Sequence, residues 1–67
     1  MSEFKNKLKA LRTERDLTIS DIAKLLGVSE RTVQYYEKGE RQPTLEGLMK
    51  LADLYEVSTD YLLGRED

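Results

Sequence analysis

The chain has no cysteine and no histidine among its 67 residues. Without cysteine it has neither a disulfide nor a thiolate, which suits a reducing cytoplasm. Without histidine, a His-containing metal site and a Ser-His-Asp triad are excluded, so carboxylate chemistry is the enzymatic route that remains. We find no nucleophile–base pair, phosphate-binding loop or metal-ligand cluster in the sequence. We therefore expect no enzyme, no cofactor and no metal.

Long apolar runs are also missing from the chain. No run approaches the roughly 18 residues of a membrane span. The first seven residues, M-S-E-F-K-N-K, lack the apolar centre of a signal peptide. These absences predict a cytoplasmic protein with no membrane partner. A chain of this length is expected to form one domain over residues 1–67, with little stability to spare.

The charge balance is mildly acidic, with a net charge of −2 and a pI near 5.1. That balance argues weakly against nucleic acid, whose binding proteins are commonly basic. The charges are unevenly distributed along the chain, however. Residues 1–43 hold nine Lys/Arg and seven Asp/Glu, a net of +2, while residues 44–67 hold two and six, a net of −4. We expect only weak non-specific binding to DNA.

The pattern of apolar residues predicts an all-α protein with no strand-like alternation. Five short helices are expected, at about 3–15, 19–26, 30–38, 45–56 and 59–63. Thr18 and Asp21 form a capping-box pattern at the second helix. Ser29, Thr44 and Ser58 are natural N-caps for the three later helices, and Gly39 fits a left-handed C-cap.

The apolar stripes of all five segments can share one core. The residues expected there are Phe4, Leu8, Leu11, Leu17, Ile22, Ala23, Leu26, Val28, Val33, Tyr36, Leu45, Leu48, Leu51, Ala52, Val57, Tyr61 and Leu62.

Residues 18–37 have the pattern of two short helices that cross steeply and touch. The small side chain of Ala23 allows a second helix to approach, and Gly27 allows a tight turn with positive φ. Val33 and Tyr36, three residues apart, lie on the inner side of the second helix. Its other side is polar or amphipathic: Glu30, Arg31, Gln34 and Tyr35. A short helix with such an outer face fits a DNA major groove.

Further short motifs, in a particular order and at particular spacings, extend over nearly the whole chain. They are Leu8-Lys9-x-Leu11-Arg12, Leu17-Thr18, Asp21-Ile22-Ala23, Leu26-Gly27-Val28-Ser29, Tyr36-Glu37-x-Gly39, Arg41-x-Pro43, Leu51-Ala52 and Val57-Ser58-x-Asp60-Tyr61-Leu62. With this set, the chain resembles the phage-repressor/Cro-like (Xre-type) helix-turn-helix family. The resemblance implies a compact five-helix lambda-repressor-like DNA-binding domain from a bacterium or phage, with the helix-turn-helix at the second and third helices.

The resemblance places the third helix in the major groove, so its outer residues become candidates for reading bases. Arg31 can donate two parallel bonds to guanine, and Gln34 can bind adenine in the same bidentate way. The simpler interpretation of Arg31 is a solvated side chain, or one paired with Glu30 or Glu37. Glu30 can accept from cytosine or merely favour the helix N-terminus. Thr32 and Tyr35 are candidates for contact with a thymine methyl group or a phosphate.

By the same resemblance, phosphate contacts are expected from the helix ends and the loop after the third helix. These residues are Thr18, Ser20, Ser29, Lys38, Arg41, Gln42 and Thr44. The resemblance also implies a salt bridge between Arg12 and Glu37 that holds the third helix in orientation. Ile19 departs from the family pattern because it stands where a phosphate-binding glutamine is usual. An exposed isoleucine there either loses the contact or packs against a DNA sugar or a partner.

The leading interpretation is a sequence-specific DNA-binding regulator, a repressor that binds a palindromic operator as a homodimer. Its dimer contacts are expected from Tyr55, Val57, Tyr61, Leu62 and Leu63. The chain could instead be the N-terminal domain of a longer repressor. The alternative from another class is a protein-interaction module, such as an antitoxin or a phage regulatory partner, that uses the same fold.

Overall fold

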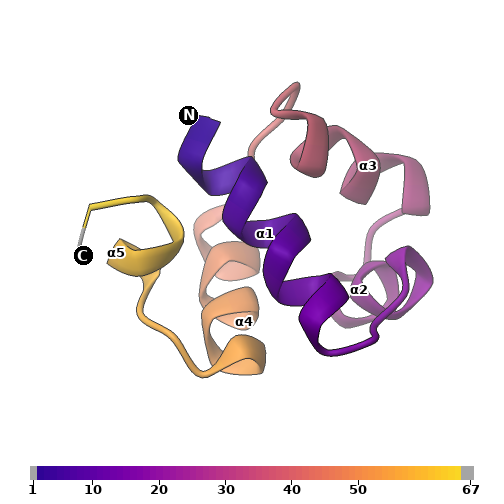
Figure 1. Ribbon diagram of the computed structural model, residues 1–67. Helices are drawn as coiled ribbons and strands as arrows, with labels where there is room; N and C mark the ends of the chain where they lie inside the picture. Colours follow the sequence, from indigo (N-terminus) through magenta and orange to yellow (C-terminus); the bar gives the residue numbers. More distant parts are fainter. Residues whose placement is uncertain (1, 66–67) are drawn as a thin grey trace.

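The computed structural model describes residues 2–65 (Figure 1); Met1, Glu66 and Asp67, at the ends of the expected domain, lie outside the described residues. The elements within this range are all helices: α1 (Ser2–Glu14), α2 (Ile19–Leu26), α3 (Glu30–Lys38), α4 (Leu45–Tyr55) and α5 (Thr59–Leu62). The predicted all-α, five-helix fold is confirmed. The predicted ends differ by one residue at α1, α4 and α5, which is within the usual ambiguity of helix termini.

Side-chain caps fix where four of the helices begin. The Thr18 side chain accepts a bond from the Asp21 N–H at 3.1 Å, and the Asp21 carboxylate accepts one from the Thr18 N–H at 2.9 Å. This reciprocal pair is the predicted capping box, and the bonds from Thr18 lower the pKa of Asp21. The predicted caps of the later helices are also present: Ser29, Thr44 and Ser58 each accept from the N–H three residues on.

Left-handed residues end the three helices in the middle of the chain. Gly27 ends α2 with φ 69°, and Gly39 ends α3 with φ 78°. Both positions suit glycine, which has no Cβ to clash there. The residue that ends α4 is Glu56, with φ 55°, a conformation that is strained for a side chain other than glycine.

One core cluster joins all five helices. Its buried members are Phe4, Leu8, Leu11, Ile22, Ala23, Val33, Tyr36, Leu51, Ala52, Tyr55 and Leu62. Tyr55 is missing from the core predicted from sequence, yet it is completely buried. The prediction that Leu45 belongs to the core is wrong, because this side chain is 80% exposed. Leu45 is the first residue of α4, so its side chain precedes the turns that face the core.

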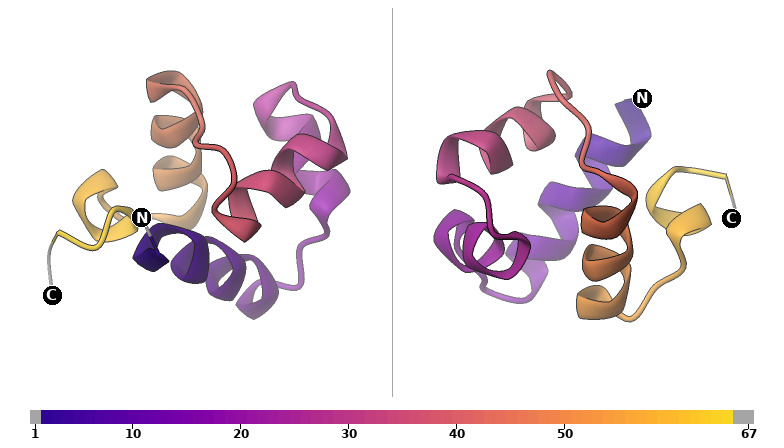
Figure 2. Two further views of the ribbon diagram at one scale, coloured as in Figure 1. Left: turned by 90° about the horizontal axis from the view of Figure 1, so that it is seen from above. Right: turned by 180° about the vertical axis from the view of Figure 1, so that it is seen from behind.

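The helices are arranged around α1, which crosses the molecule between its two ends (Figures 1 and 2). α1 packs against α3 on one side and against α5 on the other, and α2 packs against both α3 and α4. α3 and α5 therefore lie at opposite ends of the molecule, as both views of Figure 2 show. The end formed by α2 and α3 carries the residues that the sequence assigns to binding.

Candidate nucleic-acid interface

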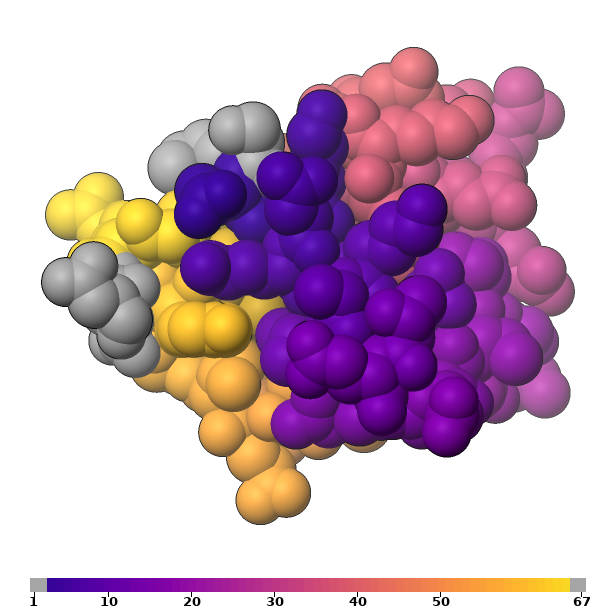
Figure 3. Space-filling model, viewed as in Figure 1, coloured from indigo at the N-terminus to yellow at the C-terminus, as the bar shows by residue number. Residues whose placement is uncertain are grey.

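α3 lies across α2 with one face in the core and one face in solvent. Val33 and Tyr36 anchor the inner face; Val33 is fully buried. On the outer face, Glu30, Arg31 and Gln34 are exposed, and Thr32 and Tyr35 are half-buried. In Figure 3 the α3 segment and the loop after it form the upper right edge of the molecule. The structure thus gathers the five predicted base-reading residues on one short helix that stands at the surface.

Two arginines converge on Tyr35. Arg31 Nε donates to Tyr35 Oη at 2.9 Å, and the Arg31 guanidinium carbon lies 5.7 Å from the centre of the Tyr35 ring. The guanidinium carbon of Arg41, from the loop after α3, lies 4.8 Å from the same ring centre. Arg31 is therefore held by Tyr35 rather than by Glu30 or Glu37, the carboxylates considered from sequence.

The hydroxyls of Ser29 and Thr32 are engaged in the cap of α3. Ser29 Oγ accepts from the Thr32 N–H at 3.1 Å and lies 3.0 Å from Thr32 Oγ1. Thr32 therefore sits beside the helix N-terminus, at the edge of the outer face. The backbone N–H groups of this first turn favour binding of a nearby anion such as a phosphate.

The predicted phosphate-contacting residues lie at the ends of the helices that border α3. Thr18 and Ser20 are at the start of α2, and Lys38, Arg41, Gln42 and Thr44 lead from the end of α3 to the start of α4. Within this set Ser20 is half-buried and the others, together with Ser29, are exposed. Within the set, Ser29 lies at the start of α3 and Lys38 at its end.

Lys5 is a cation near this surface that the sequence analysis does not identify. A Cβ atom built on Gly39 would lie 2.9 Å from Lys5 Cδ, so the Lys5 side chain rests on the turn that ends α3. A cation in this place stabilises the carbonyl end of the helix. Periodicity along α1 gives no signal of this contact, because it depends on where α3 packs.

Arg12 and Glu37 form an ion pair between α1 and the end of α3. Arg12 Nε donates to Glu37 Oε2 at 2.7 Å and Arg12 Nη2 to Oε1 at 3.2 Å, while Nη1 bonds to the Leu17 carbonyl at 2.9 Å. The two side chains are only 14% and 9% exposed. The bond to Glu37 raises the pKa of Arg12, so Arg12 stays charged over the working pH range.

Tyr55 lies in the core next to this pair. The sequence analysis instead places it in a dimer surface. Burial raises the pKa of Tyr55 to about 12, and the charge of Glu37 acts in the same direction. Its hydroxyl has no hydrogen-bond partner among the described residues. Arg15 covers the residue, donating from Nη2 to the Tyr55 carbonyl at 3.0 Å with its guanidinium 5.3 Å from the ring centre.

The structure corrects two expectations about apolar residues. Ile19, expected to be exposed, is half-buried and packs against the core cluster. Contacts within the chain therefore account for its apolar side chain. Of the five predicted dimer residues, Tyr55 and Leu62 are completely buried and cannot form a surface. Val57, Tyr61 and Leu63 are half-buried and retain an exposed part.

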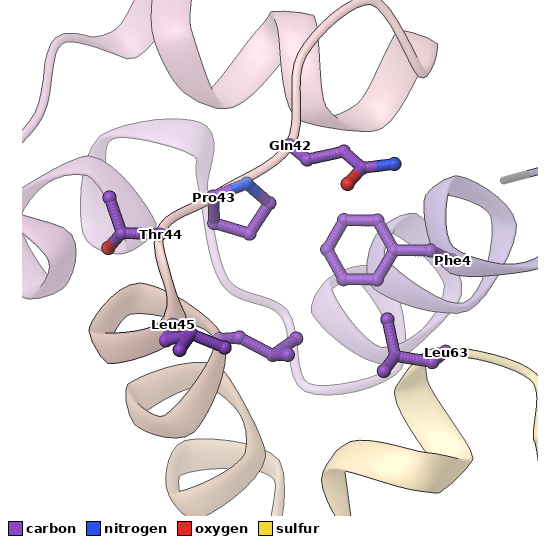
Figure 4. A pocket seen from close by; sticks show the side chains of 7 residues that line it. Phe4, Gln42, Pro43, Thr44, Leu45 and Leu63 are labelled. Carbon is purple, nitrogen blue, oxygen red and sulfur yellow. The ribbon is translucent and has the colours of Figure 1, made fainter.

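A groove that shares Gln42 and Thr44 with the predicted phosphate contacts lies between the start of α1, the loop before α4, and the end of α5 (Figure 4). Its volume is about 240 Å³, and it is lined by Phe4, Gln42, Pro43, Thr44, Leu45, Leu48 and Leu63. Met49, one turn after Leu45 on α4, is 60% exposed and extends this apolar surface. The outer surface here is apolar, in contrast to the polar face of α3.

Within residues 2–65 there is no cluster of three or more His, Cys, Asp or Glu side chains that could hold a metal ion. None of the helices described is long and apolar enough to cross a membrane. What the surface does present is a short helix, held across a second one by a glycine turn, with an outer face that carries arginine and amide groups. This is the geometry of a DNA-binding helix-turn-helix.

Comparison with known proteins supports this class. Residues 8–62 match the family model described as helix-turn-helix. Over 61 residues the chain is 43% identical to the HTH-type transcriptional regulator AnsR of Bacillus subtilis, covering 91% of this chain and 53% of AnsR. The chain therefore belongs to the helix-turn-helix family, in its Xre-like branch of transcriptional regulators.

Two solved structures show the same fold. A transcriptional regulator from Listeria innocua superposes with a TM-score of 0.90 at 41% identity, over 96% of this chain and 60% of that one. The DNA-binding domain of the P22 C2 repressor superposes with a TM-score of 0.80 at 28% identity, over 90% of this chain and 79% of that one. The predicted lambda-repressor-like fold is thereby confirmed. The chain spans about half the length of the first curated relatives it matches.

Proposed function

We propose that this chain binds duplex DNA through the outer face of α3 and acts as a transcriptional repressor. The observation that carries the proposal is Arg31, which is exposed in the first turn of a short helix whose opposite face is fixed in the core. The likeness to a domain described as the DNA-binding domain of the P22 C2 repressor supports both parts of the proposal. Because DNA is the proposed ligand, the cytoplasmic location expected from the sequence belongs to the same proposal, as does the absence of catalysis.

In this proposal the exposed residues of α3 read base edges. Arg31 donates to guanine and Gln34 binds adenine, and Glu30 accepts from the cytosine amino group. Thr32 and Tyr35 lie beside them on the same helix and complete the face. The residues at the helix ends and in the loop after α3, including Lys38 and Arg41, bind phosphates and fix the register without carrying sequence information.

We also propose that the protein binds as a homodimer on a palindromic operator. In this arrangement the half-sites are one helical turn, about 34 Å, apart. The half-buried residues Val57, Tyr61 and Leu63 offer the contacts, since they lie in or beside α5 at the end of the molecule away from α3. Tyr55 and Leu62, buried in the chain's own core, support these residues from below.

The test is selection of binding sites from a pool of random duplex DNA at two salt concentrations, with the mass of the protein measured in solution. We expect one palindrome to be enriched, and its affinity to fall steeply as salt rises because phosphates release counterions. Arg31→Ala is expected to remove about 1–3 kcal/mol of base discrimination. Arg65→Ala is the matched control, because it removes the same charge from a position after α5 rather than from α3. Failure to enrich any sequence at low salt would contradict the proposal.

A second candidate function is a protein-interaction module, such as an antitoxin or a phage regulatory partner. The observation that favours it is the apolar surface around the groove, where Leu45 is 80% and Met49 60% exposed. Binding through apolar contacts responds less to salt than binding to phosphates. A partner whose binding is lost with Leu45→Asp and unaffected by Arg31→Ala would support this second function.

A further inference from the structure

Tyr35 is predicted from the sequence to read bases, but it makes contacts within the protein that this role does not explain. Its backbone carbonyl accepts from the N–H groups of Glu40 at 2.9 Å and Arg41 at 3.4 Å, and from that of Gly39 at the C-cap. The loop after α3 is therefore folded back onto Tyr35. The Tyr35 ring is half-buried, with the guanidinium group of Arg41 over it.

The Tyr35 hydroxyl restricts how Arg31 can meet a base. Arg31 and Tyr35 are four residues apart on α3, so their side chains lie on the same face. The Nε–H of Arg31 is used in its bond to Tyr35 Oη at 2.9 Å. The guanidinium group has five N–H donors, so the four on Nη1 and Nη2 stay available. Those two terminal nitrogens form an edge that can donate in parallel to N7 and O6 of guanine.

We infer that Tyr35 is a positioning residue. Its hydroxyl holds Arg31 by Nε so that the Nη1–Nη2 edge is presented to guanine, and its ring holds Arg41 beside a phosphate. The base contact on α3 and the phosphate contact of the loop thus depend on one another through one side chain. This inference rests on the proposed function, because it concerns how the same face meets DNA.

A double-mutant cycle separates positioning from direct contact. Affinities of the wild type, Tyr35→Phe, Arg31→Ala and the double variant are measured on the selected operator and on an operator with the Arg31-read guanine replaced. Phenylalanine keeps the ring and loses only the hydroxyl, so we expect the preference for guanine to fall about fivefold, as for loss of one hydrogen bond. In the Arg31→Ala background, Tyr35→Phe should have no further effect.

The proposed coupling of Arg41 to Arg31 through the Tyr35 ring is measured separately. Arg31→Ala and Arg41→Ala should be coupled on the operator when Tyr35 is present, and additive in a Tyr35→Leu background, where the ring is absent. A direct contact between the two arginines would keep the coupling in both backgrounds, and that result would overturn the inference for Arg41.

Thr13→Val is the matched control, since it also removes one hydrogen-bonded hydroxyl from the surface of a helix, but on α1. It should change neither affinity nor the preference for guanine. An equal loss from Tyr35→Phe with and without Arg31 would mean that Tyr35 itself contacts DNA, and would overturn the inference. A wild type that selects an operator, with Tyr35→Phe losing nothing, overturns this inference alone. A wild type that selects no sequence overturns the proposed function together with it.

Discussion

α3 and α4 are built alike at their starts and differ in how they are held. Each begins with a hydroxyl cap, Ser29 or Thr44, and each buries one face in the same core. α3 ends in a relaxed glycine turn and is tied to α1 by the Arg12–Glu37 ion pair. α4 ends in a strained left-handed Glu56, and its inner face is apolar.

The outer faces of these two helices differ as well. α3 presents Arg31 and Gln34 to solvent, whereas α4 presents two apolar side chains, Leu45 and Met49, among charged ones. Directional hydrogen bonds fix a helix at one angle, while apolar contacts tolerate small shifts in packing. The comparison indicates that polar contacts set the orientation of α3, the helix proposed to bind DNA, and that apolar burial provides the stability beneath it.

The largest effect is expected from the inner face of α4. Leu51 is fully buried, so Leu51→Ala should lower the free energy of unfolding by about 2–5 kcal/mol, through lost burial and the cavity left behind. Leu45→Ala, the same change at the exposed start of the same helix, should stay within about 0.5 kcal/mol. Denaturant unfolding of both variants measures the difference. Equal losses would mean that Leu45 and Leu51 do not differ in burial as the structure shows.

The second test removes the Arg12–Glu37 ion pair that connects α3 to α1. Arg12→Ala leaves Glu37 without its partner in a site of low exposure, so we expect a loss of about 2 kcal/mol in unfolding free energy. Operator affinity should fall further than unfolding alone explains, because α3 loses its orientation. A double-mutant cycle with Glu37→Gln measures the coupling, and the absence of coupling between the two sites would contradict the assigned role.

The smallest effect concerns Tyr55, where the end of α4 meets this ion pair. Its pKa is raised from its usual value near 10 to about 12, so the folded state keeps the proton longer than the unfolded state. The contribution of Tyr55 is therefore present below pH 10 and is lost as pH rises from 10 to 12.

Tyr55→Phe should remove that part of the alkaline loss of stability. At pH 7 it should change the unfolding free energy by less than about 1 kcal/mol, since the hydroxyl has no partner among the described residues. Unfolding curves at pH 7, 10 and 11.5 provide the measurement. A large loss at pH 7 would show that the hydroxyl is bonded in solution.

Much of the fold could be predicted from sequence because its signals are local. Thr18, Ser29, Thr44 and Ser58 each bond within their own first turn, so a short window of sequence is enough to identify them. The order of the helices and the turn at Gly27 follow from the same kind of pattern. The Arg12–Glu37 pair, which joins residues 25 apart, was expected only through the family resemblance.

The errors concern residues whose surroundings are set by other helices. Leu45 and Tyr55 lie on the same apolar stripe of α4, yet one is 80% exposed and the other buried. Periodicity gives the face of a helix but not how far its neighbours extend along it. In the same way, sequence reasoning placed Tyr35 on the outer face without revealing that Arg31 and Arg41 both reach it.

The ion pair between Arg12 and Glu37 has a consequence for how such a protein can diversify. Arg12 binds α3 and the bend at Leu17 together, and Val33 fixes the inner face, so none of the residues that orient α3 points outward. Positions 30, 31 and 34 can be exchanged while the scaffold keeps its shape. If α3 reads DNA as proposed, a descendant or an engineered variant can therefore acquire a new target sequence by surface replacements alone, with no need to rebuild the protein beneath them.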